Sequence, residues 1–175
     1  QNFSSMRLPP LPADAIPSSL HQHHQQNPRT RRIVEGLGRC PEILRPWLDL
    51  YYAVVARPGA LSLKEKELLR HQQARLFECG PCSRLVRSEA PVDQDRLQRI
   101  LEPDDSFTPA ERALLRFGAR LYRGPEHVGE EDFAELGHYF DETQITEAGF
   151  VISFFAAAGR LNFGFDVFAD LEEED

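Results

Sequence analysis

From residue 30 onward, the apolar residues recur at the spacing of an α-helix. The clearest run has Ala110, Ala113, Leu114, Phe117 and Leu121 at intervals of three and four residues. The sequence shows no convincing alternation of apolar and polar residues and no hairpin turn signal, which are the marks of β-strands. The pattern therefore predicts an all-α fold.

Start and stop signals divide this pattern into separate helices. Thr108-Pro109-Ala110-Glu111 combines a capping box with proline at the first helical position, and Gly124-Pro125 ends the helix that follows. Ser62-x-x-Glu65 is a second capping box, and it opens a helix that we expect to run to residue 76. Further helices are predicted over residues 41–55, from Pro81 onward, and over residues 93–101, 130–139 and from 141 onward.

The first 29 residues have a different character. Leu8, Leu11 and Ile16 are spaced apolar anchors, and the prolines among them prevent long regular elements: Pro9, Pro10, Pro12, Pro17 and Pro28. We expect residues 1–29 to form an extended, proline-rich arm that packs on the body or on a neighbouring subunit. Residues 30–175 would then form one helical domain.

The last predicted helix is apolar nearly all round over residues 150–158 and contains small residues at Gly149 and Gly159. Such a helix is typical of the centre of a bundle or of a subunit interface. Its mostly apolar run, residues 148–159, is shorter than the roughly 20 residues that span a bilayer. We therefore expect no membrane partner.

Composition and charge narrow the function classes. A chain of 175 residues is long enough for one domain with a substantial core, and its formal net charge of -8 argues against nucleic acid or an anionic membrane as a partner. Three cysteines are too few for the disulfide framework of a secreted protein, and the first residues do not resemble a signal peptide. We expect a cytoplasmic protein.

Two of the cysteines lie in FECGPCSRLV, where Cys79 and Cys82 flank Gly80-Pro81. Gly-Pro indicates the start of a helix, and the free N–H groups at a helix start lower the pKa of a nearby thiol. The two sulfurs are one helical turn apart, so a disulfide can close between them. The pattern favours thiol–disulfide exchange.

Three other interpretations compete for this pair. A zinc site needs four ligands, and His21, His23 and His24 of the arm would reach the pair only by folding back, so no metal or other cofactor is predicted. Two small buried core cysteines remain an alternative. CGPC also occurs in thioredoxins, but there a strand enters the motif, whereas the pattern here predicts a helix.

Glu67 and His71 are four residues apart on the helix that precedes the cysteines, so they share one face. A partly desolvated carboxylate beside a thiol can accept its proton, and a neighbouring histidine can relay that proton. The alternative is an ordinary solvated glutamate with His71 as its surface partner. Spacing alone leaves both interpretations open.

These segments together resemble the alkylhydroperoxidase D-like (AhpD-like), or carboxymuconolactone decarboxylase, superfamily, in its uncharacterised peroxidase-related branch. The resemblance covers most of the chain, and its most specific element is a glutamate twelve residues before the first cysteine of a CxxC, which Glu67 and Cys79 match. It implies an AhpD-like bundle of antiparallel helices that assembles as a homo-oligomer, such as a dimer, trimer or hexamer.

The resemblance also implies roles for residues. Cys82 would attack a hydroperoxide, Cys79 would complete the disulfide, and Glu67 would be the base of a proton relay. A dithiol protein, lipoylated or thioredoxin-like, would reduce the disulfide. The sequence departs from the family pattern at Pro81 and Val86, where histidines of the relay are expected. We expect His71 to substitute for them, with His127 or His138 as candidates that only the fold can bring near.

Three functions follow. The first is a thiol-dependent peroxidase or disulfide reductase that acts through Cys79 and Cys82. The second is a lyase like the carboxymuconolactone decarboxylases, although members with that activity commonly lack the paired cysteines. The third is an oligomer that keeps the fold without the chemistry, and the absence of the relay histidines is its best support.

Overall fold

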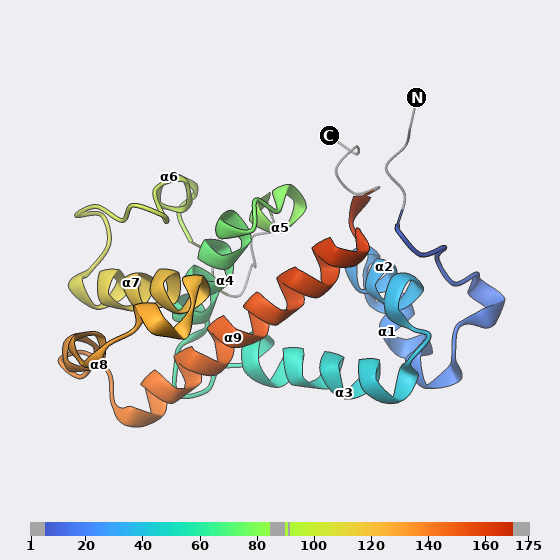
Figure 1. Ribbon diagram of the computed structural model, residues 1–175, viewed down its shortest axis with the longest axis horizontal. Helices are drawn as coiled ribbons and strands as arrows, with labels where there is room; N and C mark the ends of the chain where they lie inside the picture. Colours follow the sequence, from blue (N-terminus) through green and yellow to red (C-terminus); the bar gives the residue numbers. More distant parts are fainter. Residues whose placement is uncertain (1–5, 85–89, 91, 170–175) are drawn as a thin grey trace. The chain divides into compact units, whose positions relative to one another are not determined.

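The computed structural model describes residues 6–84, 90 and 92–169, and within these residues the secondary structure is helical with no strand (Figure 1). This confirms the all-α prediction. The chain divides into two compact units, one from Gln1–Tyr51 with Ala158–Asp175 and one from Tyr52–Ala157.

The first unit contains the N-terminal segments. Its described elements are two short 3-10 helices, η1 (Ala13–Ala15) and η2 (Ser18–Leu20), then α1 (His21–Gln26), α2 (Pro28–Leu37), α3 (Pro41–Tyr51) and the end of α9. Ile16 and Leu20 are buried with Val34, Leu44 and Leu48 in the core of this unit. The short elements agree with the effect of the prolines, while the packing of residues 1–29 on a neighbouring subunit stays a prediction.

The second unit carries the cysteine pair. It begins with the π-helical segment η3 (Tyr52–Ala56) and continues through α4 (Leu63–Leu76), α5 (Gly80–Arg84), α6 (Gln94–Gln98), α7 (Pro109–Arg123), η4 (Pro125–His127), α8 (Glu130–Leu136) and most of α9 (Glu142–Phe165). One core cluster gathers residues from α4, α7 and α9, including Leu69, Leu114 and Ile152. A second cluster places Leu68 against Leu97 and Phe107.

Both predicted capping boxes form. The Ser62 hydroxyl accepts the N–H of Glu65 while the Glu65 carboxylate accepts the N–H of Ser62, and Thr108 and Glu111 repeat this arrangement at the start of α7. These local signals fix where the two helices begin because they satisfy N–H groups that the helix itself leaves without partners.

Helix α4 is buried along most of its length, and its buried side chains are largely polar. It packs against η3, α5, α6 and α7. Its buried polar residues are Lys66, Glu67, Arg70, His71, Gln72 and Gln73. Because buried polar groups are costly unless they are hydrogen-bonded, each of these residues requires partners from the surrounding elements.

The contact between α4 and α7 depends on one glycine. The Gln72 amide donates to the carbonyl of Leu115 at 2.6 Å, and the Gln73 amide donates to the carbonyl of Gly118 at 3.3 Å. A Cβ atom at Gly118 would collide with the Gln72 side-chain oxygen and lie 3.1 Å from Leu69 Cδ2. Glycine therefore lets these two helices approach closely.

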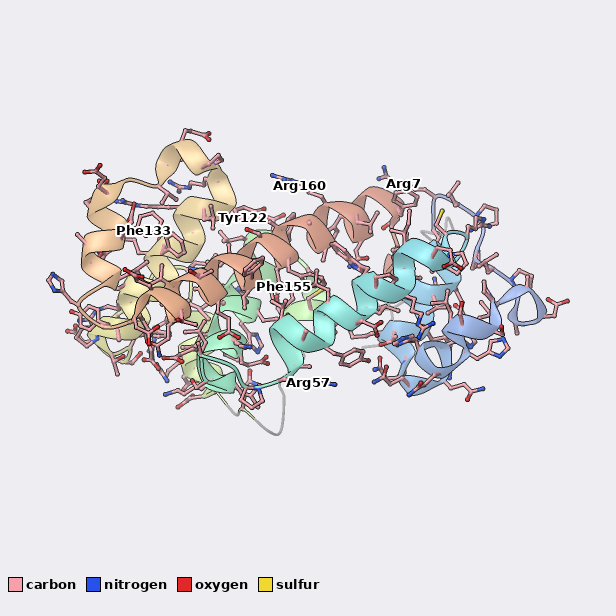
Figure 2. All side chains as sticks on the ribbon, turned by 90° about the horizontal axis from the view of Figure 1, so that it is seen from below. Arg7, Arg57, Tyr122, Phe133, Phe155 and Arg160 are labelled. Carbon is pink, nitrogen blue, oxygen red and sulfur yellow. A yellow bond between two sulfur atoms is a disulfide. The ribbon has the colours of Figure 1, made fainter. Side chains whose placement is uncertain are left out.

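Helix α9 (Glu142–Phe165) extends beyond both ends of the apolar run of residues 148–159. By length and composition it is sufficient to cross a membrane, although core helices of soluble proteins meet the same criteria. In the second unit it buries Ala148, Val151 and Ile152, but only 22% of its most apolar stretch is buried and Phe150 is 62% exposed. Phe133 lies on α8 (Figure 2), and its ring centroid is 5.8 Å from that of Phe117. The cytoplasmic location stays a prediction.

Candidate active site

The cysteine pair follows a tight reversal at the end of α4. The N–H of Cys79 donates to the carbonyl of Ala74 at 2.9 Å, and the N–H of Glu78 donates to that of Arg75 at 3.0 Å, which together form a Schellman motif. Glu78 has a φ of 55°, in the left-handed region where glycine is usual. This turn allows α5 to begin at Gly80, immediately after Cys79.

Cys79 and Cys82 are joined by a disulfide, with their Cα atoms 5.2 Å apart. Cys79 caps α5: its carbonyl accepts the N–H of Ser83 at 2.9 Å, and its sulfur accepts the N–H of Cys82 at 3.2 Å. The prediction that a new helix begins at Gly80-Pro81 with Cys82 in its first turn is confirmed, and Cys79 is the residue immediately before that helix. The two sulfurs are therefore close enough to form a disulfide with each other, as thiol–disulfide exchange requires.

The two sulfurs differ in access to solvent. Cys79 is 1% exposed, whereas Cys82 is half-buried. Of the two residues, Cys82 is therefore the one that is partly open to solvent.

A buried ion pair on α4 connects to this disulfide. Arg70 Nε and Nη2 donate to the two carboxylate oxygens of Glu67 at 2.8 and 2.7 Å, and both side chains are at most 4% exposed. Arg70 Nη1 donates to the backbone carbonyl of Cys82 at 2.8 Å. Arg70 thus bridges Glu67 and the second cysteine.

His71 lies in the same cluster and is 1% exposed. Its Nε2 is 2.8 Å from Arg70 Nη2 and 3.3 Å from a Glu67 oxygen, so this nitrogen faces both members of the ion pair.

The charge state of Glu67 follows from these contacts. Burial raises its pKa, but the hydrogen bonds and positive charge of Arg70, with His71 beside it, outweigh burial and lower the pKa to about 2. Glu67 is therefore ionised at neutral pH, and in this arrangement it is a weak proton acceptor. Its role as the relay base stays a prediction from the resemblance.

Sequence reasoning placed Glu67, His71, Cys79 and Cys82 in one site but missed Arg70. The structure brings Glu67 and His71 together and links them to Cys82 through that arginine. The available signal was the Glu-x-x-Arg spacing of Glu67 and Arg70, which places opposite charges on one helix face.

The other histidines lie elsewhere. His127 is exposed and 3.6 Å from Glu126, and the exposed His138 stacks its ring edge-on against Tyr139. Pro81 belongs to α5, and Val86, the second position where the family pattern has histidine, lies outside the described residues.

The arm histidines belong to the first unit. His24 contacts Glu35 at 3.1 Å, and His21 contacts the carbonyl of Ile16 at 2.9 Å. Among the residues that the structure describes, no group of three or more His, Cys, Asp or Glu side chains is arranged to hold a metal ion.

Aromatic residues anchor the end of α4 beside the dithiol. The Tyr122 hydroxyl of α7 donates to the carbonyl of Leu76 at 3.1 Å, and the rings of Phe77 and Tyr122 meet edge to face with centroids 4.9 Å apart (Figure 2). These contacts hold the turn that leads into Cys79.

A second buried ion pair lies one position away from Glu67. Lys66 is fully buried, its ammonium lies 2.5 Å from a Glu147 carboxylate oxygen of α9, and it donates to the carbonyl of Arg57 at 2.8 Å. The other Glu147 oxygen accepts the N–H of Leu61 at 2.7 Å. Burial raises the pKa of Glu147, but the hydrogen bonds from Lys66 and Leu61 lower it below its usual range.

Comparisons with known proteins place the fold. No family model matches the chain, and no curated protein matches it by sequence. Among solved structures, the chain is similar to an alkylhydroperoxidase AhpD core, an uncharacterised peroxidase-related protein from Ralstonia eutropha JMP134, with a TM-score of 0.75 and 18% identity over 93% of this chain and 90% of that one.

Two further solved structures resemble the chain. The debrominase Bmp8, as a cysteine-to-alanine variant in complex with 2,3,4-tribromopyrrole, matches with a TM-score of 0.68 and 19% identity over 99% of this chain and 100% of that one. An uncharacterised peroxidase-related protein from Silicibacter sp. TM1040 matches with a TM-score of 0.67 and 19% identity over 94% of each chain. The chain has the AhpD-like fold, as its motifs indicated.

Proposed function

We propose that this protein is a thiol-dependent peroxidase in which Cys82 attacks a hydroperoxide and Cys79 resolves the product. The observation that carries this proposal is the asymmetric pair: a half-buried Cys82 joined by a disulfide to a buried Cys79 at the start of α5. The similarity in fold to peroxidase-related proteins supports it.

The chemistry balances in three steps. The Cys82 thiolate attacks the outer oxygen of ROOH, the O–O bond breaks, and a proton from water completes ROH while Cys82 becomes a sulfenic acid. Cys79 then attacks the Cys82 sulfur, the S–O bond breaks, and water leaves as the disulfide forms. A dithiol carrier protein reduces the disulfide by exchange and becomes oxidised itself.

The differences between the two cysteines suit these roles. Access to Cys82 lets the hydroperoxide, and later the carrier thiol, reach its sulfur. The N–H of Cys82 that donates to the Cys79 sulfur stabilises a thiolate there. That stabilisation makes Cys79 the better leaving group when the carrier attacks Cys82, because a thiol of lower pKa leaves faster.

A second candidate is reductive dehalogenation of a small aromatic ring. The match to the debrominase Bmp8 over the full length of both chains favours it. The same dithiol supplies the two electrons: an aryl bromide and two thiols give the arene, a disulfide and hydrogen bromide. In both candidates Cys82 meets the substrate and Cys79 closes the disulfide.

Stopped-flow oxidation of the fully reduced protein tests both candidates. Cumene hydroperoxide and 2,3,4-tribromopyrrole would be compared, with disulfide formation followed by thiol titration. We expect Cys82→Ser to abolish oxidation by either substrate, and Cys79→Ser treated with the hydroperoxide to stop at a sulfenic acid that dimedone traps. Cys40→Ser, which removes the exposed free thiol, is the matched control and should react as the wild type does.

The outcome separates the peroxidase, the dehalogenase and the non-catalytic alternative. Fast oxidation by the hydroperoxide supports the peroxidase, and fast oxidation by the bromopyrrole with release of bromide supports the dehalogenase. If neither substrate oxidises Cys82 faster than free cysteine, the dithiol is not a catalytic site for these reactions and the non-catalytic alternative is favoured.

A further inference from the structure

Arg70 makes more contacts at this site than the residues that the sequence singled out. It donates to both oxygens of Glu67, to His71 Nε2 and to the carbonyl of Cys82, and its side chain is 4% exposed. Building on the proposed function, we propose that Arg70 is the positioning residue of the dithiol, which anchors Cys82 and stabilises its thiolate, and that Glu67 holds Arg70 in place rather than accepting a proton.

Covalent geometry places the guanidinium near the reacting sulfur. Nη1 lies 2.8 Å from the carbonyl oxygen of Cys82, and four covalent bonds join that oxygen to the sulfur of the same residue. With standard bond lengths, Nη1 is therefore no more than about 8 Å from the Cys82 sulfur. A buried positive charge at this distance favours a thiolate and is only weakly screened by salt.

The proton acceptors of the cluster are already occupied. One Glu67 oxygen accepts Arg70 Nε, the other accepts Nη2, and the second hydrogen of Nη2 is directed to His71 Nε2. For Glu67 to take a proton from Cys82, a charge-assisted hydrogen bond to Arg70 would have to break in a buried site. Holding Arg70 in place, in contrast, requires none of these hydrogen bonds to break.

Among the residues that the structure describes, the other ionisable groups near the pair have different surroundings. On α5 itself, Arg84 is exposed and its Nη1 lies 3.3 Å from where a Cβ of Gly80 would be, so water screens its charge. On α7, the Tyr122 hydroxyl donates to the carbonyl of Leu76. Cys79 is the partner sulfur, and Glu67 and His71 on α4 are bound to Arg70.

The test compares Glu67→Gln with the double variant Glu67→Gln, Arg70→Met. The amide oxygen introduced by Glu67→Gln still accepts a hydrogen bond from Arg70, so the single variant retains the cation at Cys82. The double variant removes the cation without leaving a buried carboxylate unpaired, which protects the fold. Arg75→Met removes an exposed arginine from the same helix and is the matched control.

Two readouts report thiolate stability without requiring turnover. The first is the pH dependence of Cys82 alkylation in the reduced protein, resolved by peptide mass spectrometry. The second is the equilibrium of the disulfide with glutathione. Circular dichroism of each variant verifies that the helices have formed.

For the double variant we expect the apparent pKa of the Cys82 thiol to rise by one unit or more, with alkylation at pH 6 about tenfold slower. The disulfide becomes about tenfold harder to reduce, a shift of about 30 mV toward more negative potential. Arg75→Met should stay within threefold of the wild type in both readouts, and Glu67→Gln, which keeps the cation but loses its countercharge, should not raise the pKa of the Cys82 thiol.

Two results would overturn the inference. If Glu67→Gln alone produced the whole change, Glu67 and not Arg70 would act on the sulfur. If the double variant matched the wild type, or Arg84→Met raised the thiol pKa by as much as the double variant, the buried contact of Arg70 with Cys82 would have no such effect. Peroxide turnover is a separate measurement, so a shift in the thiol pKa without oxidation by peroxide would refute the proposed function and leave the role of Arg70 intact.

Discussion

Lys66 and Glu67 are neighbours on α4, yet each belongs to a different buried ion pair. Lys66 meets Glu147 of α9 and the carbonyl of Arg57, so its pair joins α4 to α9 and to the segment before α4. Glu67 meets Arg70 on its own helix, and Arg70 continues to the carbonyl of Cys82. One pair connects parts of the scaffold, and the other connects the scaffold to the dithiol.

The two pairs also differ in access to water. The Glu147 side chain is 20% exposed, whereas Glu67 is 1% exposed and Arg70 is 4% exposed. A carboxylate that loses its partner can be hydrated at the first site but not at the second. Two similar ion pairs on one helix therefore differ in how much unfolding free energy is lost when a pair is broken, according to how buried the carboxylate is.

The largest expected effect comes from breaking the enclosed pair. Arg70→Met leaves the Glu67 carboxylate buried without its cation, and we expect the free energy of unfolding to fall by about 3–5 kcal/mol. Urea denaturation at pH 7 measures this change. Arg75→Met should unfold within about 0.5 kcal/mol of the wild type. If Arg70→Met lowered the free energy of unfolding by less than about 1 kcal/mol, the Glu67 carboxylate would be either bound by another group or protonated.

The pH dependence of stability is the second prediction. Because folding lowers the pKa of Glu67 from about 4.5 to about 2, its contribution to stability is complete above about pH 5 and is lost as the pH falls toward 2. The difference corresponds to about 3 kcal/mol. Glu67→Gln should lack this part of the acid dependence, which urea denaturation from pH 2 to 6 measures.

Glu78→Gln is the control for that measurement, because it removes an exposed carboxylate close to the same site. It should follow the wild-type curve. A Glu67→Gln curve that falls as steeply as the wild-type curve between pH 5 and 2 would show that Glu67 is not held ionised by Arg70.

The smallest of the three effects concerns the scaffold pair. Lys66→Met removes hydrogen bonds to Glu147 and to the carbonyl of Arg57, but Glu147 keeps its bond from the N–H of Leu61. We expect a loss of about 2 kcal/mol in unfolding free energy, with no change in the pH profile of Cys82 alkylation. Lys64→Met, at a half-exposed lysine of the same helix, is the control.

Lys66→Met distinguishes the two ion pairs by which properties change. Arg70 variants should change both stability and thiol reactivity, whereas Lys66→Met should change stability alone. An altered alkylation profile in Lys66→Met would show that the two pairs are coupled through α4 and do not act independently.

Much of the fold was predictable because its signals are local. The capping boxes at Ser62 and Thr108 and the glycine-proline step at Gly80 lie within a few residues of the helix starts that they specify. Apolar spacing placed Ala113, Leu114 and Phe117 on one helix face, and all three lie in the core. The residue spacing that carried the resemblance indicated the AhpD-like fold independently of the structural match.

The environment of α4 was not predictable in the same way. Its charged and amide residues have the composition of a solvated helix, yet most of them are buried. Their partners come from other elements: Glu147 from α9, the carbonyls of Leu115 and Gly118 from α7, and that of Cys82 from α5. No local pattern encodes contacts between residues so far apart in sequence.

The sequence by itself determined that this chain is helical, where its main helices begin, and that two cysteines lie one turn apart at a helix start, because backbone capping and side-chain periodicity act over a few residues. Only the packing of the folded chain decided that Cys79 is more buried than Cys82 and that the Glu67–Arg70 pair is buried and reaches Cys82, since burial depends on which other elements pack against these residues.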